Sequence, residues 1–228
     1  MNYNNGDKYD GEWKNDLRKG NGIYEYKNGD KYEGEWKNDK KDGKGKYEYK
    51  NGDIYDGYWK EDVIHGKGTY FYNNGDKYEG NWEIGFKEGQ GSFISKNGDK
   101  YDGEWKNDKK DGNGIMNYNN GDKYDGEWKN DLREGKGIIK YNNGDKYEGE
   151  WKNDKKDGNG IMNYNNGDKY DGEWKNDLRE GKGFLMQNNV KYEGNWKNDK
   201  MIGEAHGQIR DISIKRNDNC RHIVIIKK

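Results

Sequence analysis

The sequence of 228 residues has a single cysteine, Cys220, no proline, and only 28% hydrophobic residues. A lone cysteine excludes an intrachain disulfide, and no Asn-x-Ser/Thr acceptor for N-linked glycans occurs. No apolar stretch approaches membrane-spanning length, and the first residues lack the basic start and apolar run of a signal peptide. We therefore expect a soluble, cytoplasmic chain that does not depend on a large apolar core.

The sequence also lacks an excess of either charge, because 43 basic and 44 acidic residues are interleaved along the chain. A nucleic-acid stacking platform normally combines aromatic rings with a positive groove. Here acidic residues match the lysines, so we expect no nucleic-acid partner. Residues 201–228 contain six basic and three acidic side chains, so we expect any attraction to anionic surfaces at that end.

Aromatic residues are abundant, at 14% of the chain, and they recur at a fixed interval. Tryptophan occupies positions 13, 36, 59, 82, 105, 128, 151, 174 and 196. Each tryptophan ends a Tyr-x-Gly-x-Trp motif, and a Gly-x-Gly follows the first eight. Such a period indicates a tandem array in which each unit packs against its neighbours.

Side chains within each repeat alternate between two faces, which is the periodicity of a β-strand. Tyr32, Gly34 and Trp36 share one face, and a second strand follows at Gly45–Tyr49. Asn51-Gly52 then predicts a tight hairpin with positive φ at both positions. Glycine content and the missing 3.6-residue apolar stripe disfavour helices.

The predicted fold is all-β, an elongated single-layer antiparallel β-meander of tandem hairpin repeats that forms a twisted ribbon with an aromatic-lined trough. Gly34 and Gly45 leave room for a ring from the adjacent strand to lie over the backbone. We expect nine tandem 23-residue repeats over residues 1–205. Residues 206–228 are predicted to form a C-terminal β-hairpin, which acts either as a cap or as an association segment.

Self-association is predicted at two places, because unpaired β-edges readily pair with another chain. Residues 1–9 match 116–124, so the chain opens in the middle of a repeat with a free strand edge. The apolar C-terminal hairpin offers the other place, through Ile212, Ile214, Ile223 and Ile225. A homodimer or larger assembly through strand edges is the expected product.

The unit Tyr-[Asp/Glu]-Gly-x-Trp-x6-Gly-x-Gly, followed by a Tyr-rich strand and Asn-Gly-Asp, closely resembles the MORN repeat (membrane occupation and recognition nexus). The resemblance covers residues 3–205. It implies a non-catalytic, single-layer β-module of the kind found in junctophilins, phosphatidylinositol phosphate kinases, axonemal radial-spoke head proteins and cytoskeletal scaffolds. A scaffold or adaptor in a cytoskeletal or axonemal assembly, or at a membrane, is the function that this resemblance implies.

The sequence contains no group of residues in a pattern typical of a catalytic or metal site. His65, His206 and His222 are not clustered with a nucleophile, and no motif activates the Cys220 thiol. The acidic segment from Asn38 fails as a calcium loop, because a lysine and a tyrosine take its third and twelfth ligand positions. We expect no enzymatic activity, no metal site and no cofactor.

The favoured partner is a protein whose peptide or helix lies along the trough, against central repeats that depart most from the consensus. The candidate anchors are Tyr55, Trp59, Tyr70, Tyr78, Trp82, Phe93, Tyr101 and Trp105. One alternative is a peripheral membrane adaptor, which contacts acidic phospholipids through Arg210, Lys215, Arg216, Arg221, Lys227 and Lys228. A second alternative is a carbohydrate-binding module that uses the same aromatic rings.

Overall fold

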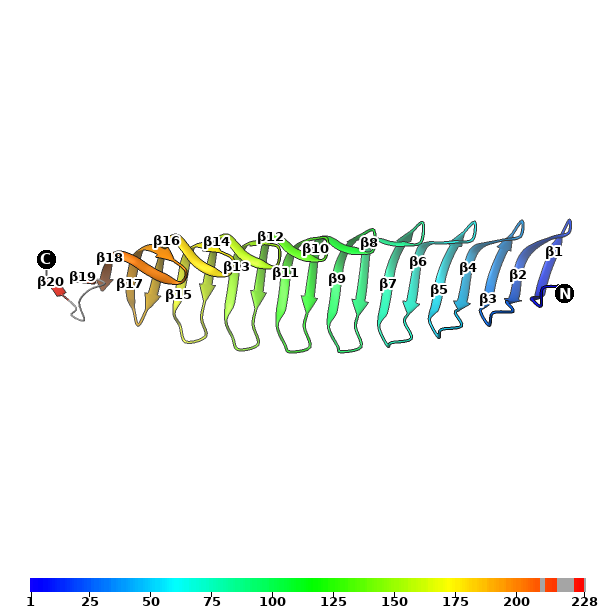
Figure 1. The fold of residues 1–228 in the computed structure, drawn as a ribbon, viewed down its shortest axis with the longest axis horizontal. Helices are drawn as coiled ribbons and strands as arrows, with labels where there is room; N and C mark the ends of the chain where they lie inside the picture. The colour runs from blue at the N-terminus through cyan, green and yellow to red at the C-terminus, as the bar shows by residue number, and fades with distance from the viewer. Residues whose placement is uncertain (210–211, 217–223, 228) are drawn as a thin grey trace. The chain divides into compact units, whose positions relative to one another are not determined.

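The computed structural model describes residues 1–209, 212–216 and 224–227, with side chains described as far as Ile202. The chain divides into two compact units, Met1–Asn119 and Asn120–Lys228. The described residues contain strands and turns and no helix. Figure 1 shows the strands of each unit following one another side by side in chain order.

The first unit is an antiparallel meander in which each strand pairs with the next. Seven-residue and nine-residue strands alternate along it. Its strands are β1 (Lys8–Lys14), β2 (Leu17–Glu25), β3 (Lys31–Lys37), β4 (Lys40–Glu48), β5 (Ile54–Lys60), β6 (Val63–Phe71), β7 (Lys77–Glu83), β8 (Phe86–Ile94), β9 (Lys100–Lys106) and β10 (Lys109–Asn117).

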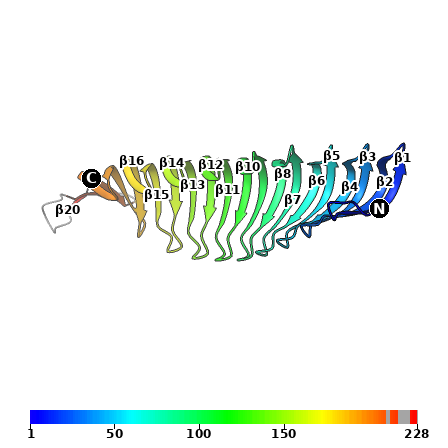
Figure 2. The same ribbon diagram turned by 45° about the vertical axis from the view of Figure 1, so that its right-hand side comes forward.

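The second unit continues the same pattern of antiparallel neighbours. Its strands are β11 (Lys123–Lys129), β12 (Leu132–Lys140), β13 (Lys146–Lys152), β14 (Lys155–Asn163), β15 (Lys169–Lys175), β16 (Leu178–Gln187), β17 (Val190–Lys197), β18 (Lys200–Ile209), β19 (Ile212–Arg216) and β20 (Val224–Lys227). The predicted all-β antiparallel meander is therefore confirmed. Figure 2 shows that the longer strands within a unit are bent.

Two kinds of hairpin connect the strands, and one of them corrects the sequence prediction. Between β3 and β4 the turn residues Asn38 and Asp39 both have positive φ, of 49° and 67°. In the Asn-Gly connection only Gly52 has positive φ, of 92°. The prediction that Asn51 and Gly52 both adopt it is wrong, because this connection is longer: Tyr49 accepts from the Gly52 N–H and donates to the Asp53 carbonyl.

Aspartates of these turns bind each repeat to a neighbouring one. The carboxylate of Asp39 accepts hydrogen bonds from the Arg18 backbone N–H at 2.8 Å and from its Nε at 3.1 Å. At the opposite ends of the strands, Asp30 accepts hydrogen bonds from the Lys50 N–H at 2.7 Å and from the Tyr47 hydroxyl at 2.9 Å. These contacts order the turns and fix the stacking of repeats.

The N-terminal residues lie against the first strand. Asn2 forms an isolated antiparallel bridge with Lys8, and the Tyr9 N–H donates to the Met1 carbonyl at 2.9 Å. The outer edge of β1 is thus partly occupied by residues of this chain. Edge-to-edge assembly remains a prediction.

Candidate partner-binding surface

The aromatic face of each unit is built from Tyr and Trp rings that pack edge to face across neighbouring repeats. Tyr32 is fully buried, and its ring centroid lies 5.1 Å from that of Trp36 and 5.5 Å from that of Trp59. The Trp59 indole N–H donates to the Gly45 carbonyl at 3.1 Å. Trp36 is only 3% exposed, whereas Trp13, which no earlier repeat of this chain covers, is 42% exposed. Burial of each tryptophan therefore depends on the repeat before it.

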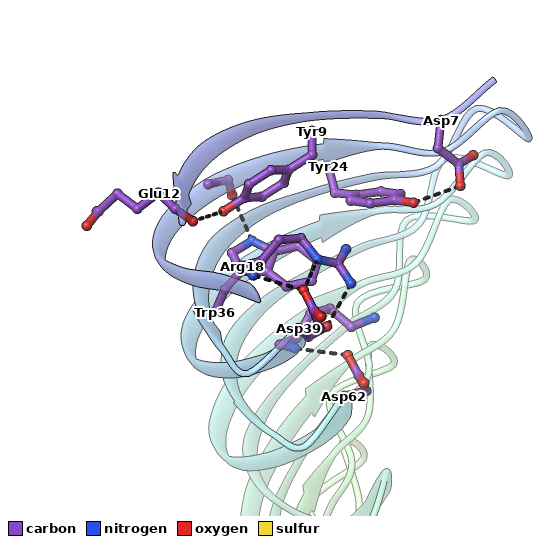
Figure 3. Close-up of polar contacts among 10 residues, drawn as sticks. Asp7, Tyr9, Glu12, Arg18, Tyr24, Trp36, Asp39 and Asp62 are labelled. Carbon is purple, nitrogen blue, oxygen red and sulfur yellow. Dashed lines mark hydrogen bonds and ion pairs between the residues drawn. The ribbon is translucent and has the colours of Figure 1, made fainter. Parts of the chain in front are cut away.

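A basic side chain covers the rings in most repeats. The Arg18 guanidinium lies 4.2 Å from the Trp36 ring centroid, and Figure 3 shows it held there by Asp39. In the next repeat, Lys41 Nζ lies 4.5 Å from the Trp59 ring centroid, and burial lowers the pKa of that lysine. Such cation–π contacts contribute about 0.5–2 kcal/mol each. On this face, basic side chains therefore lie over a layer of aromatic rings.

A continuous row of rings, which we call the tyrosine row, lies along the same face of the first unit. Successive ring centroids are 4.5 Å apart within a repeat and 5.8–6.4 Å apart between repeats. The row consists of Tyr24, Tyr26, Tyr47, Tyr49, Tyr70, Tyr72 and Phe93. In the second unit the equivalent positions alternate aliphatic and aromatic side chains: Ile139, Tyr141, Met162 and Tyr164.

Three rings of the row, Tyr26, Tyr49 and Tyr72, are partly exposed. Burial raises the pKa of both Tyr26 and Tyr72 to about 12. Partly exposed rings with low conformational entropy are the kind of surface on which partner side chains pack well.

The eight anchors predicted from the sequence are divided by the structure into buried and accessible positions. Tyr70 and Phe93 are partly exposed and belong to the tyrosine row. The other six are buried in the ring packing: Tyr55, Trp59, Tyr78, Trp82, Tyr101 and Trp105. Their binding role stays a prediction, and in this conformation the accessible surface is that of the row.

Sequence reasoning did not select Tyr26, Tyr49 and Tyr72, although they recur at the same 23-residue spacing as the tryptophans. Each opens the connection that contains Asn-Gly or Asn-Asn-Gly, which is a position outside the strands. The signal that could have identified them is this recurrence of an aromatic residue immediately before a polar turn.

The C-terminal candidates fall partly or wholly outside the described residues. Ile214 of β19 pairs in register with Ile225 of β20, and Ile212 pairs with Lys227. Their side chains, and those of Lys215 and Arg216, lie beyond the described ones. Outside the described residues altogether are Arg210, Arg221, Ile223 and Lys228, with Cys220 and His222. Lipid contact and self-association through this segment stay predictions.

Of the residues considered for catalysis, His65 has a side chain that the structure describes. His65 lies half-buried on β6 and lines a small surface depression with Glu61 and Ile84. Within the described part of the chain, no group of three or more His, Cys, Asp or Glu side chains could hold a metal ion. None of the described segments forms a helix long and apolar enough to cross a membrane.

Comparison with known proteins identifies the repeat and the fold. The family model of the MORN repeat matches nine consecutive segments: 9–31, 32–54, 55–77, 78–100, 101–123, 124–146, 147–169, 170–188 and 192–207. No curated protein matches the sequence.

Among solved structures, the wild-type TCP10 domain of Danio rerio CPAP, in complex with a peptide of Danio rerio STIL, matches with a TM-score of 0.56 and 12% identity. That match covers 98% of this chain and 100% of the zebrafish domain. The SAS-4 (dCPAP) TCP domain of Drosophila melanogaster, in complex with a proline-rich motif of Ana2 (dSTIL), matches with a TM-score of 0.41 and 18% identity. It covers 66% of this chain and 82% of that domain.

Proposed function

This chain belongs to the MORN repeat family, and on that basis we propose that it is a non-catalytic scaffold that binds a partner protein along the aromatic face of its sheet. The tyrosine row is the surface we assign to this binding. A peptide or helix from the partner lies along the row, its apolar side chains against the rings and its acidic groups against the nearby cations.

The observation that carries this proposal is the accessibility of the row. The central rings of each repeat, such as Tyr55, are fully buried and hold the sheet together. Tyr26, Tyr49 and Tyr72 remain partly exposed at one-repeat intervals and contact the rings of the next repeat. These partly exposed rings continue the aromatic face into the connections between strands, where a partner can contact them.

Cations beside the row give the surface a preference for partners with acidic groups next to apolar ones. Lys41 Nζ lies 4.7 Å from the ring centroid of Tyr47, a member of the row. An acidic side chain of a bound peptide would meet such a lysine at the edge of the ring surface. The apolar contacts would supply affinity, and the charges would set register.

The comparison with solved structures supports a peptide-binding role at the level of the fold. The zebrafish domain, which matches 98% of this chain, was solved in complex with a peptide. A sheet of this architecture can therefore present a peptide-binding surface. Which face this chain uses is assigned from its own tyrosine row.

The proposal is tested by cross-linking and affinity capture with a row variant and a matched control. The row variant combines Tyr26→Ser, Tyr49→Ser and Tyr72→Ser. The control combines Phe71→Ser and Ile94→Ser, which replace exposed apolar side chains of the other face. We expect a specific partner to be retained by the wild type and the control and lost by the row variant. Retention by all three proteins would refute the assignment to the aromatic face.

A cytoplasmic, cytoskeleton-associated setting is the second part of the proposal, and the occurrence of this repeat in cytoskeletal scaffolds supports it. Fluorescence microscopy of the tagged chain in its source cells tests it. A filamentous or punctate signal from the wild type that is lost in the row variant would support a cytoskeletal scaffold. A diffuse signal unaffected by the row variant would contradict it.

A further inference from the structure

The face opposite the tyrosine row carries a glutamate in six repeats, and each glutamate folds back onto the second strand of its hairpin. Figure 3 shows Glu12 pointing away from the aromatic side. In the next repeat, Glu35 Oε1 accepts a hydrogen bond from the Lys44 backbone N–H at 2.9 Å. The glutamates are Glu12, Glu35, Glu104, Glu127, Glu150 and Glu173, and the donors are the N–H groups of Asn21, Lys44, Asn113, Lys136, Asn159 and Lys182.

The carboxylate fits there because of a local irregularity in the sheet. The register between β3 and β4 shifts between Gly34 and Trp36, which leaves the Lys44 N–H outside the regular pairing with β3. The carboxylate also lies over Gly43, where a Cβ atom would be 2.6 Å from Glu35 Oε2. The bulge thus forms a backbone site that accepts a carboxylate.

Three repeats lack the glutamate: asparagine takes its place in repeat nine, at Asn195, and repeats three and four retain the bulge without it. Tyr58 and Asn81 occupy the glutamate position, and the register shifts there as in the other repeats. The equivalent backbone donors are the N–H groups of Lys67 and Gln90. No described side chain accepts a hydrogen bond from either group, whereas Glu35 accepts one from the equivalent Lys44 N–H. The two N–H groups are placed as in the other repeats, but the carboxylate is missing.

Space is available at the same two positions. A Cβ atom on Gly66 would come no closer than 3.4 Å to Tyr58 Cβ, and one on Gly89 no closer than 3.4 Å to Asn81 Nδ2. An open depression of about 580 Å³ spans both bulges and reaches Lys67 and Gln90. The depression around Glu150 in the second unit, where the glutamate is present, is smaller, about 360 Å³.

The side chains around this depression define what it can bind. Tyr58 is 51% exposed, and both it and Lys67 line the depression. Asp56 and Glu79 also line it, and Glu79 is paired with Lys77 at 2.8 Å. Net positive charge is therefore not the basis of recognition. Selectivity would come from the two N–H groups, each shaped to receive one carboxylate oxygen.

We propose that this depression binds an acidic peptide, two of whose carboxylates replace the missing glutamates at Lys67 and Gln90. The two donors are one repeat apart, which is two strand spacings or about 10 Å. Three residues of a polyproline II peptide span about 9 Å and return side chains to the same face. The site therefore fits Asp or Glu at positions i and i+3 of an extended segment. It lies on the opposite face from the tyrosine row and is independent of it.

Amide NMR spectroscopy of the full chain tests this site directly. The probe is an acetylated, amidated peptide of about seven residues with glutamates three positions apart, and its control carries glutamine at both places. We expect the amide signals of Lys67 and Gln90 to shift on titration with the acidic peptide. The glutamine peptide should bind at least about tenfold more weakly, because hydrogen bonds to charged groups are the stronger ones.

Two double variants test whether binding depends on the empty carboxylate positions or on the side chains of Tyr58 and Asn81. Tyr58→Glu with Asn81→Glu restores the residue of the other six repeats and should abolish binding, since the chain's own carboxylates fill both places. Tyr58→Ala with Asn81→Ala leaves both carboxylate positions empty and should retain binding. The proposal is overturned if the glutamate variant still binds, if the alanine variant does not, or if acetate alone at the same concentration saturates both amides.

Discussion

Gly34 and Gly45 face each other across β3 and β4 so closely that a Cβ atom on Gly34 would lie 2.4 Å from Gly45 Cα. Because the opposing atom belongs to the backbone, no side-chain rotation relieves the contact. The same Cβ atom would lie 2.6 Å from the hydroxyl oxygen of Tyr32. The buried tyrosine and the two glycines are therefore one packing unit, repeated along the chain.

Gly34→Ala is expected to lower the free energy of unfolding by about 2 kcal/mol or more, as overpacking does in a close-packed interior. Gly194→Ala is the matched control in the ninth repeat, where the nearest contact of the new Cβ atom is Met201 at 3.6 Å. That change should stay within about 0.5 kcal/mol of the wild type. Urea denaturation of both variants measures the difference, and equal losses would contradict the packing account.

Ile84 is expected to cost stability because it holds a left-handed conformation in the β7–β8 turn. Its φ is 49°, its side chain is 70% exposed, and most other repeats have asparagine there. A β-branched residue in this region is strained, so Ile84→Asn should raise the free energy of unfolding by about 1 kcal/mol. Asn107→Ile, at the same position of the next repeat, should lower it. Thermal denaturation measures whether each variant gains or loses stability. A destabilised Ile84→Asn protein would show that Ile84 is not strained.

Acid should weaken the array through its turn aspartates. The Arg18 backbone N–H and then its guanidinium hold the pKa of Asp39 below its ordinary value, and the Lys27 N–H and the Tyr24 hydroxyl do the same for Asp7. A pKa that is lower in the folded than in the unfolded chain adds stability above about pH 4, which is lost as pH falls through the folded-state pKa. Urea midpoints should therefore decrease below about pH 4.

Asp39→Asn provides the control for that pH dependence. The variant should be less stable than the wild type at neutral pH, because it loses the charged acceptor for Arg18. It should also lose less stability on acidification. Parallel pH profiles for the two proteins would show that Asp39 does not contribute to the acid transition.

Alkali should weaken the array through its tyrosines. Burial, with the hydrogen bond to Asp7, raises the pKa of Tyr24 to about 12, and burial raises that of Tyr26 to about 12. Since the ordinary value is about 10, the unfolded chain loses these protons first, and stability should fall from about pH 10 to pH 12. Ultraviolet absorbance should show tyrosinate forming together with loss of the β-sheet circular dichroism signal. Full ionisation with the sheet intact would contradict the buried environment.

Much of the fold could be predicted from local pattern. The alternation of Tyr32, Gly34 and Trp36 placed all three on one face, and the structure buries the two rings there. The turn chemistry was harder, since Asn-Gly and Asn-Asp both tolerate left-handed φ. Only the strand pairing shows that Asn38 and Asp39 form the two-residue hairpin.

The accessible part of the candidate site could not be predicted in the same way. Tyr32 and Tyr49 belong to the same kind of aromatic pattern, but Tyr32 is covered by Trp36 and Trp59 while Tyr49 opens a connection. Exposure is decided by the neighbouring repeat, which the sequence of one repeat does not show. The bulge that holds Glu35 was similarly hidden, because it depends on a register shift between two strands.

The central claim, that the tyrosine row binds a protein partner, is tested most directly by measuring the affinity of the captured partner for three proteins. Isothermal titration calorimetry would compare the wild type, the triple variant Tyr26→Ser, Tyr49→Ser and Tyr72→Ser, and the control Phe71→Ser with Ile94→Ser. Because buried aromatic anchors carry much of the binding energy, we expect the triple variant to bind at least about a hundredfold more weakly and the control to bind like the wild type. Equal affinity for all three, with circular dichroism showing intact sheets, would contradict the account.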